Sequence, residues 1–237
     1  MKLDKVKKWF ENVWYHYKFH IICVAFFIAF LIIVTMQMTS REKIDINIMY
    51  TGPNYIGSEL SGMKHAFIQT MSDDYNGDGE KGVQITDITL MTDKQISERV
   101  KAADKLGEKF LYNPNDNQDA RKKFELEIFS GESVICLLDP YWFDYVCDAS
   151  GLLPLEEALG YKPAEMINEY GVYLKDTEFG KFYTIFENFA DDTVLCIRRM
   201  TTTTIFKNNK GEESRYNNHK EMLKDIFEFN VKEDTSE

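Results

Sequence analysis

Cysteine is scarce in this chain, and none of its four cysteines belongs to a Cys-x-x-Cys pair. Cys23 lies in a long apolar run, which leaves Cys136, Cys147 and Cys196 for the rest of the chain. Disulfide-rich domains and structural zinc sites need clustered cysteines, so the pattern indicates neither. Cys136 and Cys196 each fall in an apolar, strand-like run. We predict that they are buried free thiols that pack as small hydrophobic side chains.

Positive charge is also scarce. The chain holds 28 Lys and Arg against 39 Asp and Glu, a formal net charge of −11. The first 40 residues carry five positive and two negative charges, so the remainder carries 23 against 37, a net charge of −14. Such a domain repels phosphate backbones, which argues against nucleic acid as a partner.

Recognisable catalytic groupings are missing from the sequence as well. His65 and His219 fall within helical patterns, and no serine or cysteine nucleophile stands in a familiar setting. The many acidic residues are typical of solvated faces. We therefore do not expect an enzyme, and the sequence shows no internal repeat.

What the chain does contain is a long uncharged run near its start, with no charge between Lys18 and Arg41. About 20 residues of helix cover the roughly 30 Å hydrocarbon layer of a bilayer. A helix that is apolar on every side does not suit the surface of a small soluble domain. The run predicts a membrane anchor over residues 19–40, which attaches the chain to a membrane.

The flanking charges predict the orientation of this anchor. Five cations precede the run, at Lys2, Lys5, Lys7, Lys8 and Lys18. Basic residues beside a span stay inside, so residues 1–18 form a basic and aromatic cytoplasmic segment and residues 41–237 an extracytoplasmic domain. A cleaved secretory signal is the main alternative, and a buried helix of a soluble fold is another. The run is long for a signal, and Thr35–Ser40 lacks the small-residue pattern of a cleavage site.

Removing the first 40 of the 237 residues leaves 197, enough for one domain with a full core. Alternating or continuous apolar runs predict strands at 44–50, 83–90, 133–139 and 193–198, with short extended segments at 171–174 and 180–183. Helical spacing predicts helices at 58–71, 93–110, 118–129, 140–146 and 217–229. Ser58 and Asp139 are expected N-caps, and Gly131 is expected to end its helix. This order predicts an α/β fold with a mainly parallel sheet flanked by helices.

Several segments of the domain occur in the order found in bacterial extracellular solute-binding proteins. They are Glu127–Asp139 followed by Tyr141-Trp142-Phe143, then Leu152–Leu155, Gly180–Tyr183 and Val194–Ile197. On these segments the chain resembles that family, which implies a periplasmic-binding-protein-like fold. Members have a second lobe before the chain returns to the first, whereas here only Met200–Arg215 separates the last strand from the final helix. The resemblance therefore implies one lobe, with a small solute, a transporter or a surface protein as its partner.

A binding site is expected where the first and third strands end. In open α/β sheets, ligands bind beyond the carboxyl ends of the strands. The candidate ligand-binding residues are Tyr50, Thr51, Gly52 and Asn54 after the first strand, and Asp139, Tyr141 and Trp142 after the third. Gly52 would let a ligand approach the backbone, Asp139 would accept hydrogen bonds, and the aromatic rings would stack on a sugar or peptide. The alternative is that Asp139 only caps its helix and the rings fill the core.

One acidic loop resembles a calcium site. Asp74, Asn76 and Asp78 have the spacing of an Asp-x-Asn-x-Asp-Gly loop, in which alternate oxygens surround the cation. The twelfth position, which normally supplies a bidentate Glu, is Ile85. A turn rich in Asn, Asp and Gly also forms without metal, so calcium stays a weak expectation and no other cofactor is expected.

Together these features predict a membrane-anchored extracytoplasmic binding module that contacts a small solute or a partner protein. The alternative is a structural or assembly subunit of a membrane or cell-surface complex that binds no small molecule. An aromatic, polar pocket beside Asp139 would favour the first, and an exposed apolar patch the second.

Overall fold

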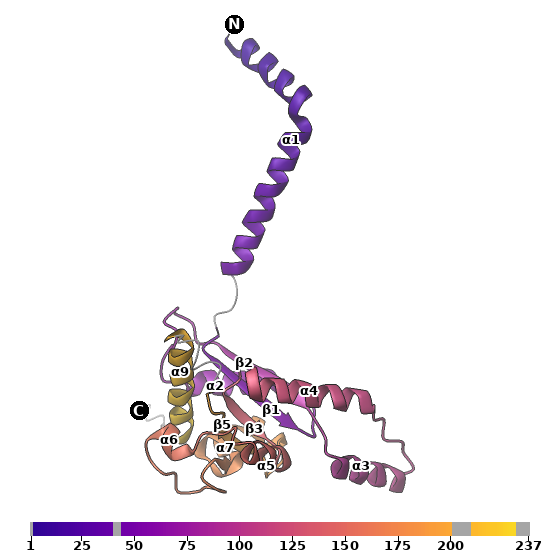
Figure 1. Ribbon diagram of the computed structural model, residues 1–237, viewed down its shortest axis with the longest axis vertical. Helices are drawn as coiled ribbons and strands as arrows, with labels where there is room; N and C mark the ends of the chain where they lie inside the picture. Colours follow the sequence, from indigo (N-terminus) through magenta and orange to yellow (C-terminus); the bar gives the residue numbers. More distant parts are fainter. Residues whose placement is uncertain (1, 40–43, 201–209, 231–237) are drawn as a thin grey trace, which may run out of the picture. The chain divides into compact units, whose positions relative to one another are not determined.

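The computed structural model describes residues 2–39, 44–200 and 210–230 (Figure 1). The chain forms two compact units, Met1–Glu42 and Lys43–Glu237. The first unit is a single helix, α1 (Lys2–Thr39). Within it, Val13–Val34 is long and apolar enough to cross a membrane. The most apolar part of this stretch is not buried inside the protein. This confirms an apolar N-terminal helix, with its apolar stretch beginning six residues before the predicted start at residue 19.

The second unit is built on one sheet of five strands. These are β1 (Ile46–Gly52), β2 (Val83–Thr89), β3 (Ile135–Leu138), β4 (Gly171–Tyr173) and β5 (Val194–Ile197). Their spatial order is β2-β1-β3-β5-β4. The β1 strand pairs in parallel with both β2 and β3, whereas β5 runs antiparallel to β3 and to β4. The predicted α/β class with a mostly parallel sheet is confirmed.

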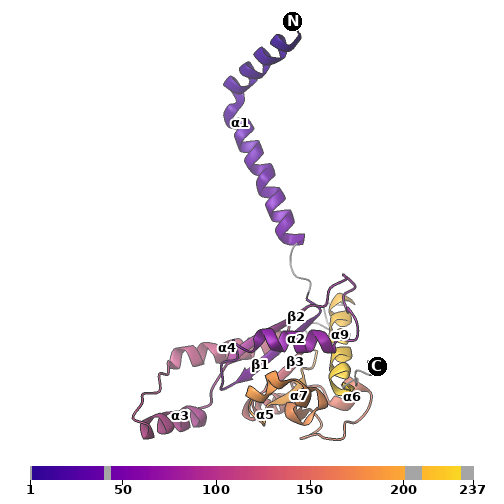
Figure 2. The same cartoon turned by 180° about the vertical axis from the view of Figure 1, so that it is seen from behind.

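Helices cover both faces of the sheet. The helices of this unit are α2 (Leu60–Thr70), α3 (Asp93–Lys105), α4 (Pro114–Ser130), α5 (Pro140–Asp148), α6 (Leu155–Leu159), η1 (Leu174–Asp176), α7 (Glu178–Phe182), η2 (Thr184–Asn188) and α9 (Lys210–Phe227). Figures 1 and 2, which look from opposite sides, show α4 and α2 on opposite faces. Both views place α3 beyond the ends of β1 and β2 instead of against the sheet.

Strand alternation divides the buried side chains into two cores. Ile46, Ile48 and Tyr50 of β1 point into a large core shared with α2, α6, α7 and α9. Met49, on the opposite face of β1, belongs to a smaller core with α4 and α5. Residues at alternate positions of a strand point to opposite faces, so a strand covered on both sides buries every side chain. All seven residues of β1 are buried, as this arrangement requires.

Several predicted local features were wrong. Gly180–Tyr183 was expected to be extended, but Glu178–Phe182 forms α7, whose N-cap Thr177 accepts a hydrogen bond from the Gly180 amide at 2.9 Å. Ser58 does not cap α2. The N-cap is Glu59, with no side-chain capping bond, and the Ser58 hydroxyl instead donates to the Glu59 carboxylate at 2.7 Å.

Helix boundaries also differ from the prediction. The α3 helix ends at Lys105 instead of residue 110, and α4 begins at Pro114 because Asn113 caps it and proline suits the first turn. The α9 helix begins at Lys210, seven residues before the predicted start. Gly131 does end α4 and Asp139 does cap α5, as predicted.

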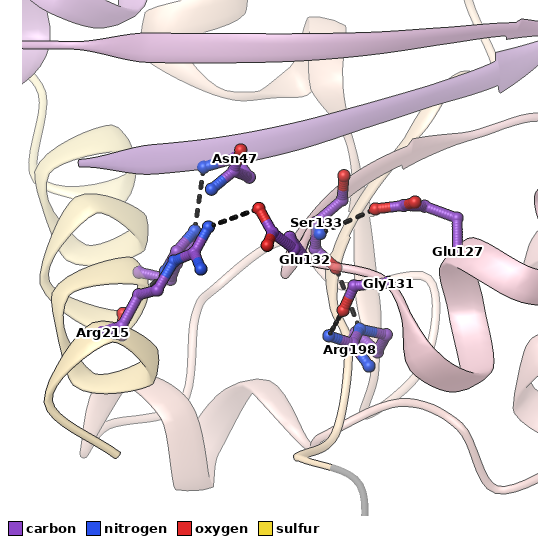
Figure 3. Close-up of polar contacts among 8 residues, drawn as sticks. Asn47, Glu127, Gly131, Glu132, Ser133, Arg198 and Arg215 are labelled. Carbon is purple, nitrogen blue, oxygen red and sulfur yellow. Dashed lines mark hydrogen bonds and ion pairs between the residues drawn. The ribbon is translucent and has the colours of Figure 1, made fainter. Parts of the chain in front are cut away.

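Buried polar groups join the elements at the edge of the sheet where β1 and β3 begin (Figure 3). The Arg198 guanidinium, which follows β5, donates to the carbonyls of Ser133, Gly131 and Ile128 at 2.9, 2.8 and 3.2 Å. The backbone amide of Asn47 donates to Nε2 of His219 on α9 at 2.9 Å. These bonds satisfy backbone groups that the β3 ladder and the end of α4 leave without regular partners.

Candidate functional site

The carboxyl ends of three parallel strands meet at the opposite edge of the sheet. Thr51 and Gly52 end β1, which lies between β2 and β3. Their carbonyls accept hydrogen bonds from the Asp139 and Leu90 amides, both at 2.8 Å. The expectation that the first and third strands end side by side is therefore confirmed. The chain leaves this edge into α3 after β2 and into α5 after β3.

An open cavity of about 670 Å³ lies between the first turns of α3 and α5. One wall comes from the β2–α3 connection and the first two turns of α3, and the other from the start of α5. Two residues of α4, Asn117 and Arg121, and Asp192, just before β5, complete the lining. Because β5 is antiparallel, its amino end reaches the same edge as the carboxyl ends of β1 and β3.

Asp139 holds the two walls together. Its Oδ1 accepts the Tyr141 amide at 3.0 Å, which caps α5, and its Oδ2 accepts Nε2 of Gln95 at 2.8 Å. Burial raises the pKa of this carboxyl above its usual value, although the bonds from Gln95 and Tyr141 act in the opposite direction. The nearby charge of Asp192 raises it further. Asp139 therefore does more than cap its helix, because it also fixes the position of α3.

None of the residues of α3 is fully buried, and polar contacts link the helix to the body of the domain. Thr92 and Gln95 form a reciprocal capping box at its start. Further along, Arg99 donates to the Pro53 carbonyl at 2.9 Å and to Oδ1 of Asn54 at 2.6 Å. The capped start of α3 is thus placed against the cavity by Gln95 and Arg99.

Two aromatic side chains at the start of α5 differ in their availability. Tyr141 is 56% exposed, so its ring is open to a ligand. Trp142 is only 3% exposed and packs against Phe124, with ring centroids 5.2 Å apart. The Arg121 guanidinium lies 5.9 Å from the Trp142 ring. Within the part of the chain that the structure describes, the buried Nε1 of Trp142 has no hydrogen-bond partner.

The other predicted ligand-binding residues pack in the interior or hold α3. Tyr50 and Thr51 are buried, and Gly52 lies under the Tyr50 ring, where a Cβ would come within 2.5 Å of the hydroxyl oxygen. Glycine at this position is therefore explained by side-chain packing. Asn54 is partly exposed and holds Arg99. A ligand role for these four residues stays a prediction, and none of them lines the cavity.

The acidic loop 74–78 satisfies its own backbone. Asp74 accepts hydrogen bonds from the amides of Asn76, Gly77 and Gly79, at 3.2, 2.9 and 2.6 Å. These bonds lower the pKa of the Asp74 carboxyl, with the Gly79 bond contributing most. Asp45 also reaches the loop, with its Oδ1 accepting the Asn76 amide at 2.8 Å. Among the described residues, no group of three His, Cys, Asp or Glu side chains is placed to hold a metal. Calcium binding here stays a prediction.

Negative charge dominates the cavity lining. Five carboxylates face two cations: Asp93, Glu98, Asp139, Asp144 and Asp192 against Lys94 and Arg121. Arg121 is itself paired with Glu125 at 3.1 Å. A cationic or neutral ligand therefore fits this lining better than an anion.

Sequence reasoning missed Gln95, Arg121 and Asp192. Gln95 could have been found, because Thr92-x-x-Gln95 is a capping-box pattern just after the second predicted strand. Ligands bind beyond strand ends, and this rule applies to the second strand as well as to the first and third. Asp192 had no such signal, because only the antiparallel direction of β5 brings it to this edge.

No family model, curated protein or solved structure matches the chain.

Proposed function

We propose that this chain is a membrane-anchored extracytoplasmic binding module that holds a small solute in the cavity beside Asp139. The observation that supports this proposal is the cavity itself, which is lined by a buried carboxyl, an exposed tyrosine and the first turns of two helices. Its location at the carboxyl ends of parallel strands is where open α/β sheets bind ligands. The arrangement agrees with the resemblance to one lobe of a solute-binding protein.

The lining also suggests the class of ligand and the strength of binding. Excess negative charge favours an amine or guanidinium group, which Tyr141 can contact through its ring face. One lobe leaves one side of the ligand in water, and this weakens polar contacts and limits the buried area. We therefore expect dissociation constants no tighter than about 1 μM, or about 8 kcal/mol.

A second function, assembly of a membrane or surface complex, has its own supporting observation. The segment from α3 into α4 exposes apolar side chains, with Leu106 75% and Leu111 92% exposed. A helix that buries none of its residues gains little from packing, and a partner protein would supply the missing contacts. In this reading the cavity holds no small molecule.

The proposed orientation can be tested on cells whose wall has been removed. With a tag at the N-terminus, added protease should degrade the chain beyond Ser40 and leave the tag intact, because the basic segment stays inside. Protection of the large domain would contradict the orientation. Recovery of a mature protein lacking residues 1–38 would show a cleaved signal in place of an anchor.

Ligand binding can be followed through Trp142, the only one of the three tryptophans that lies outside α1. In the full chain in detergent, Trp9→Phe and Trp14→Phe make Trp142 the sole tryptophan reporter. We expect L-arginine and trilysine to change its fluorescence with micromolar to millimolar affinity, and L-glutamate to bind more weakly. Maltotriose provides a neutral comparison.

Tyr141→Ala should weaken arginine or trilysine binding about tenfold, or about 1.4 kcal/mol, through loss of the exposed ring. Tyr161→Ala is the matched control, because Tyr161 is also exposed but does not line the cavity. Nanomolar binding would refute the one-lobe interpretation. Absence of binding by all four probes would favour the assembly function.

A further inference from the structure

Two cysteines face each other across the sheet. In the antiparallel ladder between β3 and β5, Cys136 is the direct partner of Cys196. Both are fully buried, and both belong to the core that packs against α4 and α5, so their side chains lie on the same face. The Cys196 thiol donates to the Cys136 carbonyl, with the sulfur and oxygen 3.7 Å apart.

This register satisfies the first requirement of a disulfide. Directly opposed residues of an antiparallel pair have Cα atoms about 4.5–5.5 Å apart. Disulfide-bonded cysteines have Cα separations of about 4.4–6.8 Å, with both Cβ atoms on the same side. We propose that Cys136 and Cys196 are a disulfide-forming pair that a disulfide-bearing oxidant joins across β3 and β5.

The position of the pair gives the bond a structural consequence. Among the described strands, the parallel part of the sheet, β2-β1-β3, pairs with β5 and β4 through the β3–β5 ladder alone, which contains four residue pairs. A disulfide between Cys136 and Cys196 would link β3 to β5 covalently. It would also close the chain that contains α5 and Asp192, two parts of the cavity lining, because the two cysteines are 60 positions apart.

The chemistry is a thiol–disulfide exchange in two steps. One cysteine thiolate attacks the oxidant disulfide, which forms a mixed disulfide and releases one thiol. The second cysteine thiolate then attacks the protein sulfur of that mixed disulfide and releases the second thiol. The two protein thiols lose two electrons and two protons, and the oxidant disulfide is reduced to two thiols.

Access decides when this exchange takes place. Burial raises the pKa of the Cys196 thiol well above its usual value, and a buried thiol is a poor nucleophile. The exchange therefore takes place while β5 is separated from β3, either during folding or when the β3–β5 ladder opens. Cys147 is half-buried on α5, where burial raises its pKa to about 11, and it has no such cross-strand partner in the described ladder.

The test uses the full chain in detergent, unfolded in urea and refolded in buffers with different ratios of reduced to oxidised glutathione. Free thiols are then alkylated, and the digest is analysed by mass spectrometry. We expect a linked Cys136–Cys196 peptide in oxidising buffer and alkylated Cys147. The linked form should melt at least about 5 °C higher than the reduced form, because the bond constrains the unfolded chain.

Cys147→Ala should keep both the linked peptide and the rise in melting temperature, whereas Cys196→Ala should lose both. Two results would overturn the proposal: alkylation of both Cys136 and Cys196 after refolding with oxidised glutathione, or a bond from either one to Cys147. This outcome does not depend on ligand binding or on the orientation of the anchor, so it is separable from the proposed function.

Discussion

Replacing Arg198 with alanine is expected to lower the free energy of unfolding by about 3 kcal/mol or more. For a domain of this size, that loss corresponds to a fall of roughly 6–12 °C in melting temperature. Arg198 is 7% exposed, and its guanidinium donates to three backbone carbonyls. The measurement is thermal unfolding of the full chain in detergent, followed by near-ultraviolet circular dichroism.

The physical reason lies at the carboxyl end of α4. The last carbonyls of a helix have no partner within it, and their dipoles make this end partly negative. Arg198 donates to the carbonyls of Ile128 and Gly131 there, and to Ser133 just before β3. Removing the guanidinium leaves buried acceptors unsatisfied, each at a cost of about 1–3 kcal/mol before any relaxation.

Arg199→Ala is the matched control for this prediction. Arg199 is the next residue, is exposed, and its side chain donates to the Leu152 carbonyl at 3.2 Å. Its loss should cost about 1 kcal/mol or less. Equal melting temperatures for the two variants would show that the carbonyls around Arg198 find other donors. Arg198→Lys should fall between wild type and alanine, because one ammonium cannot reproduce the fork of the guanidinium.

Local patterns were enough to predict much of the fold. The alternation in Ile44–Tyr50 and the continuous apolar run before Asp139 predicted β1 and β3. A strand buried on one face alternates apolar and polar residues, and a strand buried on both faces is a continuous apolar run. Asp139 followed by Pro140 predicted the start of α5 for a similar reason, since both signals act within one turn. The same reasoning predicted Ser58 as the cap of α2 and was wrong, because the Ser58 hydroxyl donates to the Glu59 carboxylate and the Ile56 carbonyl accepts the amides of Glu59 and Leu60.

Long-range features could not be read in this way. Nothing near Val194 states that β5 runs antiparallel, yet this direction brings Asp192 to the cavity and sets Cys196 opposite Cys136. Arg198 bonds to residues 65 to 70 positions away, and its neighbour Arg199 has the same side chain at the surface. Which arginine is buried depends on the packing of α4 against the sheet. The candidate cavity therefore lies at the edge where a site was predicted, but several of its lining residues were not predicted.

Acid is expected to destabilise the domain through His219. This side chain is fully buried, and its Nε2 accepts the Asn47 amide at 2.9 Å. Its Nδ1 therefore carries the proton and donates to the Arg215 carbonyl at 2.7 Å. Burial lowers the pKa of His219 from 6.5 to about 4, and the charges of Arg215 and Arg198 act in the same direction. A protonated ring would lose the bond from Asn47, because both ring nitrogens would then be donors.

The direction of the effect follows from proton binding. Below pH 6.5 the unfolded chain protonates this histidine while the folded chain does not, so stability falls as the pH is lowered towards 4. The loss approaches about 1.4 kcal/mol per pH unit and reaches about 3 kcal/mol in total. Asp45, Asp87 and Asp139 act in the opposite direction, because burial raises the pKa of each carboxyl and favours the folded state in acid. The histidine contribution must therefore be isolated by a difference between variants.

His219→Gln provides that difference, because a glutamine oxygen can accept the Asn47 amide and does not titrate. At pH 7.5 this variant should melt below wild type, and the gap should close or reverse by pH 4.5. His65→Gln on the exposed face of α2 is the control, and its melting temperature should differ from wild type by the same small amount at both pH values. A gap between His219→Gln and wild type that stays constant from pH 7.5 to 4.5 would show that His219 does not make folding acid-sensitive. A closing gap would identify the bond between α9 and β1 as the acid-sensitive contact of the domain.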